Sequence, residues 1–292
     1  MSNSLSLYAL VSYFVIYSFV GWIVEVIYQA LKKGKIINRG FLNGPVCPIY
    51  GFGMVAVLLF FNYIEIDNLQ EASGFFLFII GILFSTVIEL FGGWTLDKLF
   101  HTRWWNYSNE KYNLHGYICL KFSIIWGIGV VFIMHVIHPV VQKFSVNLIP
   151  EKIGWWILAI LYIIYFVDLV VTVTEIIGLN KQIVQLEEAK KSLRSVSDAI
   201  SNRVGGDTLK TSQKIEEAQI QTELAKQEFT DDLMAKKEMY EKRIRDTRSN
   251  IEKRKRAVVR LMKAFPELDM HEYQSGMEEL QKFLESMKDK AE

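Results

Sequence analysis

Long, unbroken apolar stretches constrain this chain more than any other feature of its sequence. About 20 helical residues cross a hydrocarbon layer of ~30 Å, so a continuous apolar stretch of about 18 residues or more indicates a membrane-spanning helix. Five stretches fit this pattern, at residues 5–31, 47–63, 74–96, 117–141 and 153–179. The sequence therefore predicts a transmembrane domain over residues 1–180, built as a bundle of five helices.

The remaining residues, 181–292, are of a different kind. Residues 1–179 hold only 10 of the 33 basic and 10 of the 32 acidic residues, so most of the charge lies in the tail. Such a segment is too charged to cross a bilayer or to build a large core. A basic run at 253–256 is balanced by acidic neighbours, and we read it as a solvated helix face and expect no nucleic acid partner.

Apolar residues in the tail repeat at helical spacing, with a turn predicted at the glycines of 205–207 and a long second helix over 208–263. Three apolar seams result, formed by Leu186, Ala189, Leu193, Val196 and Ile200, by Ile244, Ile251, Val258 and Phe265, and by Tyr273, Met277, Leu280 and Leu284. The expected fold class is all-α, with a five-helix transmembrane bundle followed by a long cytosolic coiled coil or helical hairpin.

Charges in the loops predict the orientation. Loop one (32–46) carries four basic residues, whereas loop two (64–73) carries three acidic residues and no basic one. Loops rich in Lys and Arg stay in the cytosol. We therefore expect loop one, loop three (97–116) and the tail in the cytosol and the N-terminus outside. The two cysteines, Cys47 and Cys119, are expected to be free thiols.

Four acidic residues lie inside the predicted spans, where a charge costs about 2.5–3.5 kcal/mol. Glu25, Glu89 and Glu175 come from three helices and lie at nearly one depth, about 10 Å below the cytosolic edge by the helical rise. Asp168 lies deeper, and Lys121 is the nearest basic partner. One interpretation is a polar, cytosol-facing cavity for a cation, a proton or a polar substrate. The other is structural, with the carboxylates capping helices, pairing with Lys121 or facing headgroup water.

Loop one contains a glycine- and proline-rich segment that cannot be helical throughout. Its candidate site residues are Asn38, Arg39, Gly40, Asn43 and Gly44. Free backbone N–H groups beside Arg39 would suit a phosphate or a carboxylate. An ordinary turn explains the same residues, and the Gly-Lys-Ser/Thr ending of a phosphate-binding loop is missing.

Loop three is dense in aromatic and amide side chains. Its candidate residues are Trp105, Asn106, Tyr107, Asn113 and His115, which fit either a lid over the acidic level or a belt at the membrane interface. No CxxC or HxxxH spacing is present, so we predict no metal site and no cofactor.

Three ordered motifs carry a resemblance to a known family: GWIVEVIYQ at 21–29, NRGFLNGPVCPIYGFG at 38–53 and WWNYSNEKYNLHGYICLKFSIIWG at 104–127. Over about residues 5–180 the chain resembles the ABC-transporter type IV permease family of CmpB-like bacterial integral membrane proteins. The resemblance implies a shared core of Glu25, Asn38, Arg39, Gly40, Gly44, Pro45, Pro48, Gly51 and Glu89. The chain departs from the family pattern at Asn106 and Tyr117, where an acidic and a basic residue are common.

The resemblance implies a multi-pass protein of the bacterial plasma membrane that works with a separate ATPase. The chain has no Walker A motif, and no nucleophile constellation supports a lipid-modifying enzyme. We therefore expect a transport-related subunit rather than an enzyme, and a homo-oligomer because five spans form a small permease. The alternative is a membrane-anchored scaffold or sensor that acts through a coiled-coil partner of its tail.

Overall fold

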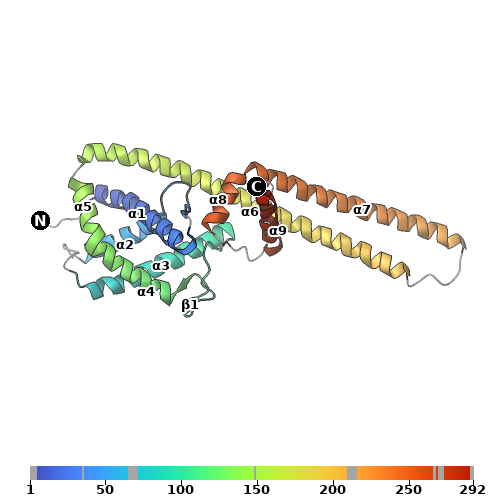
Figure 1. Ribbon diagram of the computed structural model, residues 1–292, viewed down its shortest axis with the longest axis horizontal. Coiled ribbons are helices and arrows are strands. Elements are labelled where there is room, and N and C mark those ends of the chain that lie inside the picture. The colour runs from blue at the N-terminus through green and yellow to red at the C-terminus, as the bar shows by residue number, and fades with distance from the viewer. Residues whose placement is uncertain are drawn as a thin grey trace. The chain divides into compact units, whose positions relative to one another are not determined.

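The computed structural model describes residues 5–34, 36–64, 72–147, 149–208, 216–265, 268 and 273–289. The described chain is helical apart from its loops and one pair of two-residue strands, so the predicted all-α class is confirmed (Figure 1). It divides into two compact units. Unit 1 comprises Met1–Ile176 with Arg260–Asp269, and unit 2 comprises Ile177–Val259 with Met270–Glu292.

Unit 1 is a bundle of antiparallel apolar helices. It contains α1 (Leu7–Lys33), α2 (Pro48–Tyr63), α3 (Gly74–Phe100), α4 (Leu120–Phe132), a π-helical turn η1 (Ile133–Ile137), α5 (His138–Asn147) and the first part of α6 (Glu151–Thr208). In chain order α1 packs on α2, α2 on α3 and α3 on α4, while α5 returns to α1. The strands β1 (Asn113–Leu114) and β2 (Ile118–Cys119) pair antiparallel just before α4.

Local sequence signals explain where these helices begin and end. The Ser6 hydroxyl accepts the backbone N–H of Ala9 and caps the start of α1, and Gly34 ends that helix with a φ of 65°. Pro48 opens α2, where its missing N–H costs nothing. Pro139 follows η1, and a proline that crowds the preceding turn favours such a widened π turn.

Four helices in the described residues are long and apolar enough to cross a membrane, rather than the five that the sequence predicts. They cover Leu7–Leu31, Gly74–Phe100, Leu120–Lys143 and Glu151–Ala199. The predicted second span, 47–63, becomes the apolar helix α2, which has only 16 residues. At 1.5 Å per residue α2 is about 24 Å long and falls short of a ~30 Å hydrocarbon layer. The glycines and prolines before Pro48 prevent an earlier start.

The core of unit 1 depends on small residues that bring helix backbones together. Between α1 and α2, a Cβ on Gly51 would lie 2.3 Å from Ser18 Oγ and 2.7 Å from the Phe14 carbonyl oxygen. Between α3 and α4, Gly81 and Gly127 contact each other's helices in the same way. Small residues at these crossings let membrane helices pack closely, because lipid provides no hydrophobic force that drives them together.

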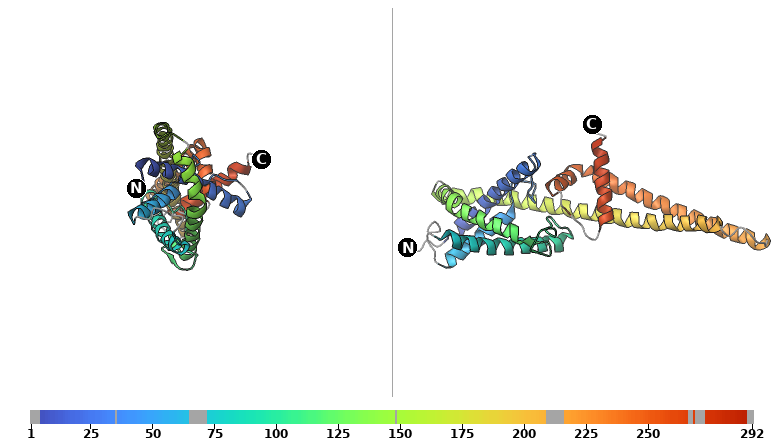
Figure 2. Two further views of the ribbon diagram at one scale, coloured as in Figure 1. Left: turned by 90° about the vertical axis from the view of Figure 1, so that its left-hand side faces the viewer. Right: turned by 60° about the horizontal axis from the view of Figure 1, so that its bottom comes forward.

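Unit 2 contains the second part of α6, then α7 (Glu216–Lys253), the first residues of α8 (Lys255–Ala264) and α9 (Gln274–Asp289) (Figure 2). The predicted turn at 205–207 is wrong, because α6 continues through both glycines to Thr208. A glycine inside a helix lowers the stability of that helix by only about 1 kcal/mol relative to alanine. Two glycines therefore weaken α6 but do not end it. The predicted helix 208–263 is divided by a turn at Arg254, and its residues 209–215 lie outside the described residues.

The amphipathic face predicted for the last helix is confirmed. Met277, Leu280 and Leu284 of α9 are all buried. Arg248 of α7 and Lys190 of α6 both form ion pairs with Glu279 of α9. Helix α9 is therefore held by apolar contacts and by a carboxylate that bonds to two other helices. That the tail forms a coiled coil stays a prediction.

Candidate functional site

Glu25 lies near the end of α1 and bonds to both loop one and α2. Its Oε2 is 3.2 Å from Nη1 of Arg39, and its Oε1 accepts the hydroxyl of Tyr50 at 2.6 Å. The Arg39 guanidinium also lies 5.6 Å from the centroid of the Tyr28 ring. The side chains of Glu25 and Arg39 are each about one-fifth exposed, at 22% and 23%. This is a paired, partly shielded carboxylate rather than an isolated one.

Asn38 organises the start of loop one. Its side-chain oxygen accepts Nε1–H of Trp22 at 2.7 Å and the backbone N–H of Gly40 at 3.2 Å. Its side-chain amide donates to the carbonyl of Asn43 at 2.8 Å. One amide thus ties both ends of the turn to α1, which explains why loop one folds back onto the bundle.

Asp168 of α6 binds the other end of loop one. Its two carboxylate oxygens accept the backbone N–H groups of Asn43 at 3.0 Å and Gly44 at 2.7 Å. Thr172, one turn later on α6, donates to Asp168 at 3.3 Å and accepts the Asn43 side-chain amide at 2.9 Å. The backbone donors that the sequence suggested for a phosphate or carboxylate ligand are therefore bonded to a carboxylate of the chain itself.

Glu89 of α3 is the most buried of the span carboxylates, with 7% of its surface exposed. Its Oε1 accepts the hydroxyl of Tyr107 at 2.8 Å, while its Oε2 is buried and has no hydrogen-bond partner among the described residues. Burial and the charge of Glu89 raise the pKa of Tyr107, so this hydroxyl stays neutral and donates. The Tyr107 ring stacks on Phe122, with 4.7 Å between the ring centroids.

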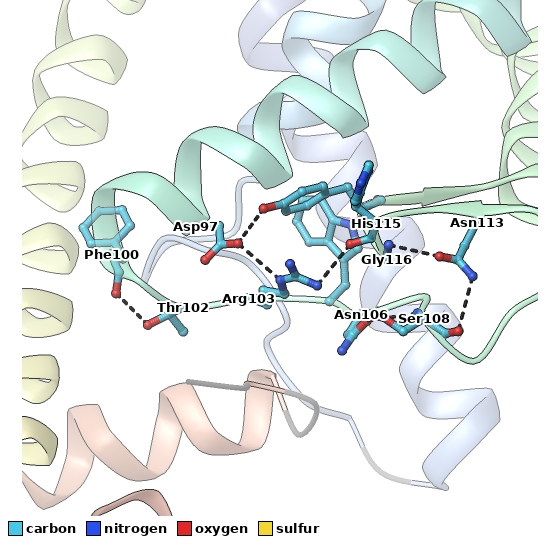
Figure 3. A network of polar contacts seen from close by, with 11 residues as sticks. Asp97, Phe100, Thr102, Arg103, Asn106, Ser108, Asn113, His115 and Gly116 are labelled. Carbon is cyan, nitrogen blue, oxygen red and sulfur yellow. Dashed lines mark hydrogen bonds and ion pairs between the residues drawn. The ribbon is translucent and has the colours of Figure 1, made fainter. Parts of the chain in front are cut away.

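Loop three is braced by a polar network around Arg103 (Figure 3). Nε of Arg103 lies 3.2 Å from Oδ2 of Asp97, and its Nη1 donates to the His115 carbonyl at 3.1 Å. The hydroxyl of Tyr117 donates to the same Asp97 oxygen at 2.5 Å. Of His115, only the backbone enters this network.

The other candidate residues of loop three also support its shape. Asn106 accepts the backbone N–H and the hydroxyl of Ser108 at 3.0 and 2.6 Å. Asn113 donates to the Ser108 carbonyl at 3.2 Å and accepts the backbone N–H of Gly116 at 3.1 Å (Figure 3). The same amide also donates to the Glu110 carbonyl at 2.7 Å. Trp105 donates to the Tyr117 carbonyl at 2.8 Å. These side chains position Tyr107 rather than point at one common ligand.

Lys121 lies apart from the span carboxylates. Its Nζ is 3.0 Å from Glu110 of loop three, and both side chains are exposed to solvent. Glu175 keeps one buried oxygen, Oε2, without a hydrogen-bond partner in the described chain. Glu175 interacts electrostatically with Arg260, a basic residue that was not among the candidates predicted from the sequence.

By the charged or polar group on which they act, the span carboxylates fall into two groups. Glu25 and Glu89 both raise the pKa of Tyr107, so they lie around one hydroxyl. Asp168 and Glu175 both act on Arg260. Loop one joins the groups, because Arg39 pairs with Glu25 while the backbone of 43–44 binds Asp168.

Three partners were missed by the sequence reasoning. Tyr50 lies in the loop-one motif, and Thr172 lies four residues after Asp168 on one helix face, so spacing could have suggested both. Arg260 had no such local signal.

Comparison with known proteins gives one family. The family model described as "Putative ABC-transporter type IV" matches residues 12–173, which is more than half of the chain. No curated protein and no solved structure matches the chain. The matched region includes Glu25, Glu89, Asp168 and both loops that bind them.

Proposed function

Because the chain belongs to the family described as "Putative ABC-transporter type IV", we propose that it is the membrane subunit of a transport system driven by a separate ATPase. The observation that carries the proposal is that the family match coincides with the helices that can cross a membrane and with the carboxylates they bury. The absence of a Walker A motif in the sequence is the reason for placing ATP hydrolysis on another chain.

The group around Glu25 and Glu89 is the proposed binding site. The group contains two carboxylates and a guanidinium, that of Arg39, which forms its ion pair with Glu25. Both carboxylates cannot stay ionised in a low-dielectric bundle unless further positive charge arrives. A proton or a small cation on Glu89 balances the group, with the Tyr107 and Tyr50 hydroxyls as neighbouring ligands. The proposed cavity opens to the cytosol when loops one and three move.

The two loops are suited to act as gates because each is bonded to a span carboxylate. Arg39 and the 43–44 backbone connect loop one to Glu25 and Asp168. Tyr107 connects loop three to Glu89. A change of charge at Glu89 therefore alters a hydrogen bond that positions loop three, which couples occupancy of the site to the shape of the loop.

The topology is part of the same proposal. We place the N-terminus outside, and loops one and three and the tail in the cytosol of a bacterial cell, because loop one is basic. Loops one and three can lie on one side only if α2 also crosses, so this topology requires the 16-residue helix α2, which packs on both α1 and α3, to cross where the bilayer is thinned. A homo-oligomer completes the pathway.

The experiment compares Glu89→Gln with wild type in complexes purified from native membranes. The amide preserves an acceptor for Tyr107 but removes the charge, so we expect ATPase activity and ATP-dependent proton uptake in vesicles to fall about tenfold or more. Glu110→Gln is the matched control, because that carboxylate is exposed in loop three and pairs with Lys121. The proposal fails if no ATPase accompanies the chain, or if Glu89→Gln is as active as wild type.

A second function is favoured by the fold of unit 2. Helix α9 ties α6 and α7 together through Glu279, and Leu280 beside it is 0% exposed. Such a folded tail suits a scaffold or sensor that recruits a cytosolic partner. Leu280→Asp separates the two functions. A cellular phenotype lost in Leu280→Asp but kept in Glu89→Gln would favour the scaffold.

A further inference from the structure

A short part of the tail is packed within unit 1. Residues 260–269 belong to that unit, although the sequence places them far beyond the last span. Leu261 and Ala264 of α8 are 2% and 0% exposed, and Leu268 is also buried. The neighbouring basic residues Arg256 and Lys263 face solvent. One face of this segment therefore packs against the protein.

Arg260 binds the backbone of loop one directly. Its Nη1 donates to the Leu42 carbonyl at 3.0 Å and to the Gly40 carbonyl at 3.4 Å. Leu42 is itself 0% exposed. Burial lowers the pKa of Arg260, and the charges of Glu175 and Asp168 act in the opposite direction. An arginine stays protonated in proteins, so a cation lies against this turn.

Two opposite charges thus hold the backbone of loop one. Asp168 accepts the N–H groups of Asn43 and Gly44, while Arg260 donates to the carbonyls of Gly40 and Leu42. Within one short turn, backbone N–H groups bond to a carboxylate and backbone carbonyls bond to a guanidinium. Charge-assisted hydrogen bonds of this kind are about twice as strong as neutral ones, so the shape of the turn depends on both charges.

Aromatic contacts extend the docking to loop three. The Phe265 ring meets Trp104 edge to face, with 4.6 Å between the centroids. Trp104 in turn meets Phe41 of loop one at 5.2 Å. Residues 260–265 therefore contact both loops of the proposed gate, through Arg260 on loop one and Phe265 on loop three.

Arg260 is only partly hydrogen-bonded in its docked position. Nε and Nη2 of Arg260 are buried without hydrogen-bond partners among the described residues. Burying charged donors without partners costs free energy. Docking therefore stabilises this segment less than it would if every donor of Arg260 were hydrogen-bonded.

We infer that loops one and three form a docking surface for an amphipathic helix that presents an arginine and a phenylalanine, and that residues 260–265 occupy it as a releasable latch. While docked, Arg260 and Phe265 hold the loops in one shape. Release frees the Gly40 and Leu42 carbonyls and uncovers Trp104. Since Val259 of the tail directly precedes Arg260 in α8, an event in the tail has a covalent route to the loops.

Hydrogen–deuterium exchange of the full chain tests this inference. We expect Arg260→Ala to raise the exchange rate of peptides from 38–47 by about tenfold or more, because charged hydrogen bonds to that turn are lost. Phe265→Ala should accelerate exchange near Trp104. Arg256→Ala, an exposed arginine one turn earlier in the same helix, should match wild type, and so should peptides from α9 in every variant.

Two results overturn the latch. One is wild-type exchange in 38–47 and around Trp104 for both Arg260→Ala and Phe265→Ala. The other is an equal effect of Arg256→Ala. If Arg260→Ala does not fold, Arg260→Lys replaces it, since lysine retains the charge but not the forked donors. For Arg260→Lys, an exchange rate of the 38–47 peptides above that of wild type supports the latch, and a rate equal to that of wild type contradicts it. These readouts need no ATPase, so they stand or fall apart from the proposed function.

Discussion

Three of the four acidic side chains inside the predicted spans have partners of different kinds. Glu25 pairs with a guanidinium, Asp168 accepts two backbone N–H groups, and Glu89 accepts a tyrosine hydroxyl. Such bonds are stronger in a low-dielectric interior than in water, and losing one leaves a buried group unsatisfied. The carboxylates therefore support the loops as well as define a site.

Asp168→Asn gives a direct measure of that support. The amide keeps the size of the side chain but removes the charge, and its NH2 group meets the N–H donors of Asn43 or Gly44. We expect the free energy of unfolding of the detergent-solubilised protein to fall by about 2 kcal/mol or more, which lowers its melting temperature. Asp198→Asn, exposed on the same helix α6, should leave the melting temperature unchanged. Equal melting temperatures for wild type and Asp168→Asn would contradict this role.

At the scale of helices, close crossings at glycine decide which faces can meet. Gly51→Val places new atoms within 2.3 Å of Ser18 Oγ and forces α1 and α2 apart. Overpacking of this kind costs about 1–3 kcal/mol. We expect a lower melting temperature for Gly51→Val. Gly129→Val is the matched control, because a Cβ on Gly129 of α4 meets nothing within 4 Å. Similar losses for both variants would show that glycine contributes through helix propensity alone.

Helix α9 should loosen in acid. Burial alone would raise the pKa of Glu279, but the hydrogen bond and charge of Arg248, with Lys190, lower it further than burial raises it. The folded carboxyl therefore binds protons more weakly than the unfolded one. Its stabilising contribution is complete above the unfolded pKa of about 4.3 and is lost as the pH falls through the folded value.

Limited proteolysis of α9 between pH 3 and pH 7 measures this dependence. Glu279→Gln should make cleavage nearly independent of pH and faster than wild type at pH 7. Glu278→Gln, on the exposed side of the same helix, should retain the wild-type profile. A wild-type profile for Glu279→Gln would refute the assignment.

For the whole molecule, the sequence predicted those features that depend on neighbouring residues along the chain. Apolar length located the long membrane helices, and a 3–4 spacing located the buried face of α9 through Met277, Leu280 and Leu284. Glycine and proline content identified loop one as irregular. The bounds predicted for α2 agree with the helix to within one residue, but so short an apolar stretch was wrongly taken as long enough to span a membrane.

The partners of the candidate residues were beyond such signals. Equal depth suggested one acidic level, but depth says nothing of rotation about a helix axis, and the carboxylates divide into two groups. The amides of loop three, such as Asn106 and Asn113, form bonds within the loop that composition alone cannot distinguish from ligand contacts. The pairing of Arg260 with Leu42 spans 218 residues and has no periodic signature.

That separation also sets an order of events during translation. The turn at Gly40 and Leu42 leaves the ribosome long before Arg260 is synthesised. A nascent chain that already contains the four long apolar helices of the described residues still lacks the cation that completes this turn. A late step of synthesis thus finishes a structure that began some 220 residues earlier. Chains truncated ahead of Arg260 would expose an incomplete turn to the proteases that remove defective membrane proteins.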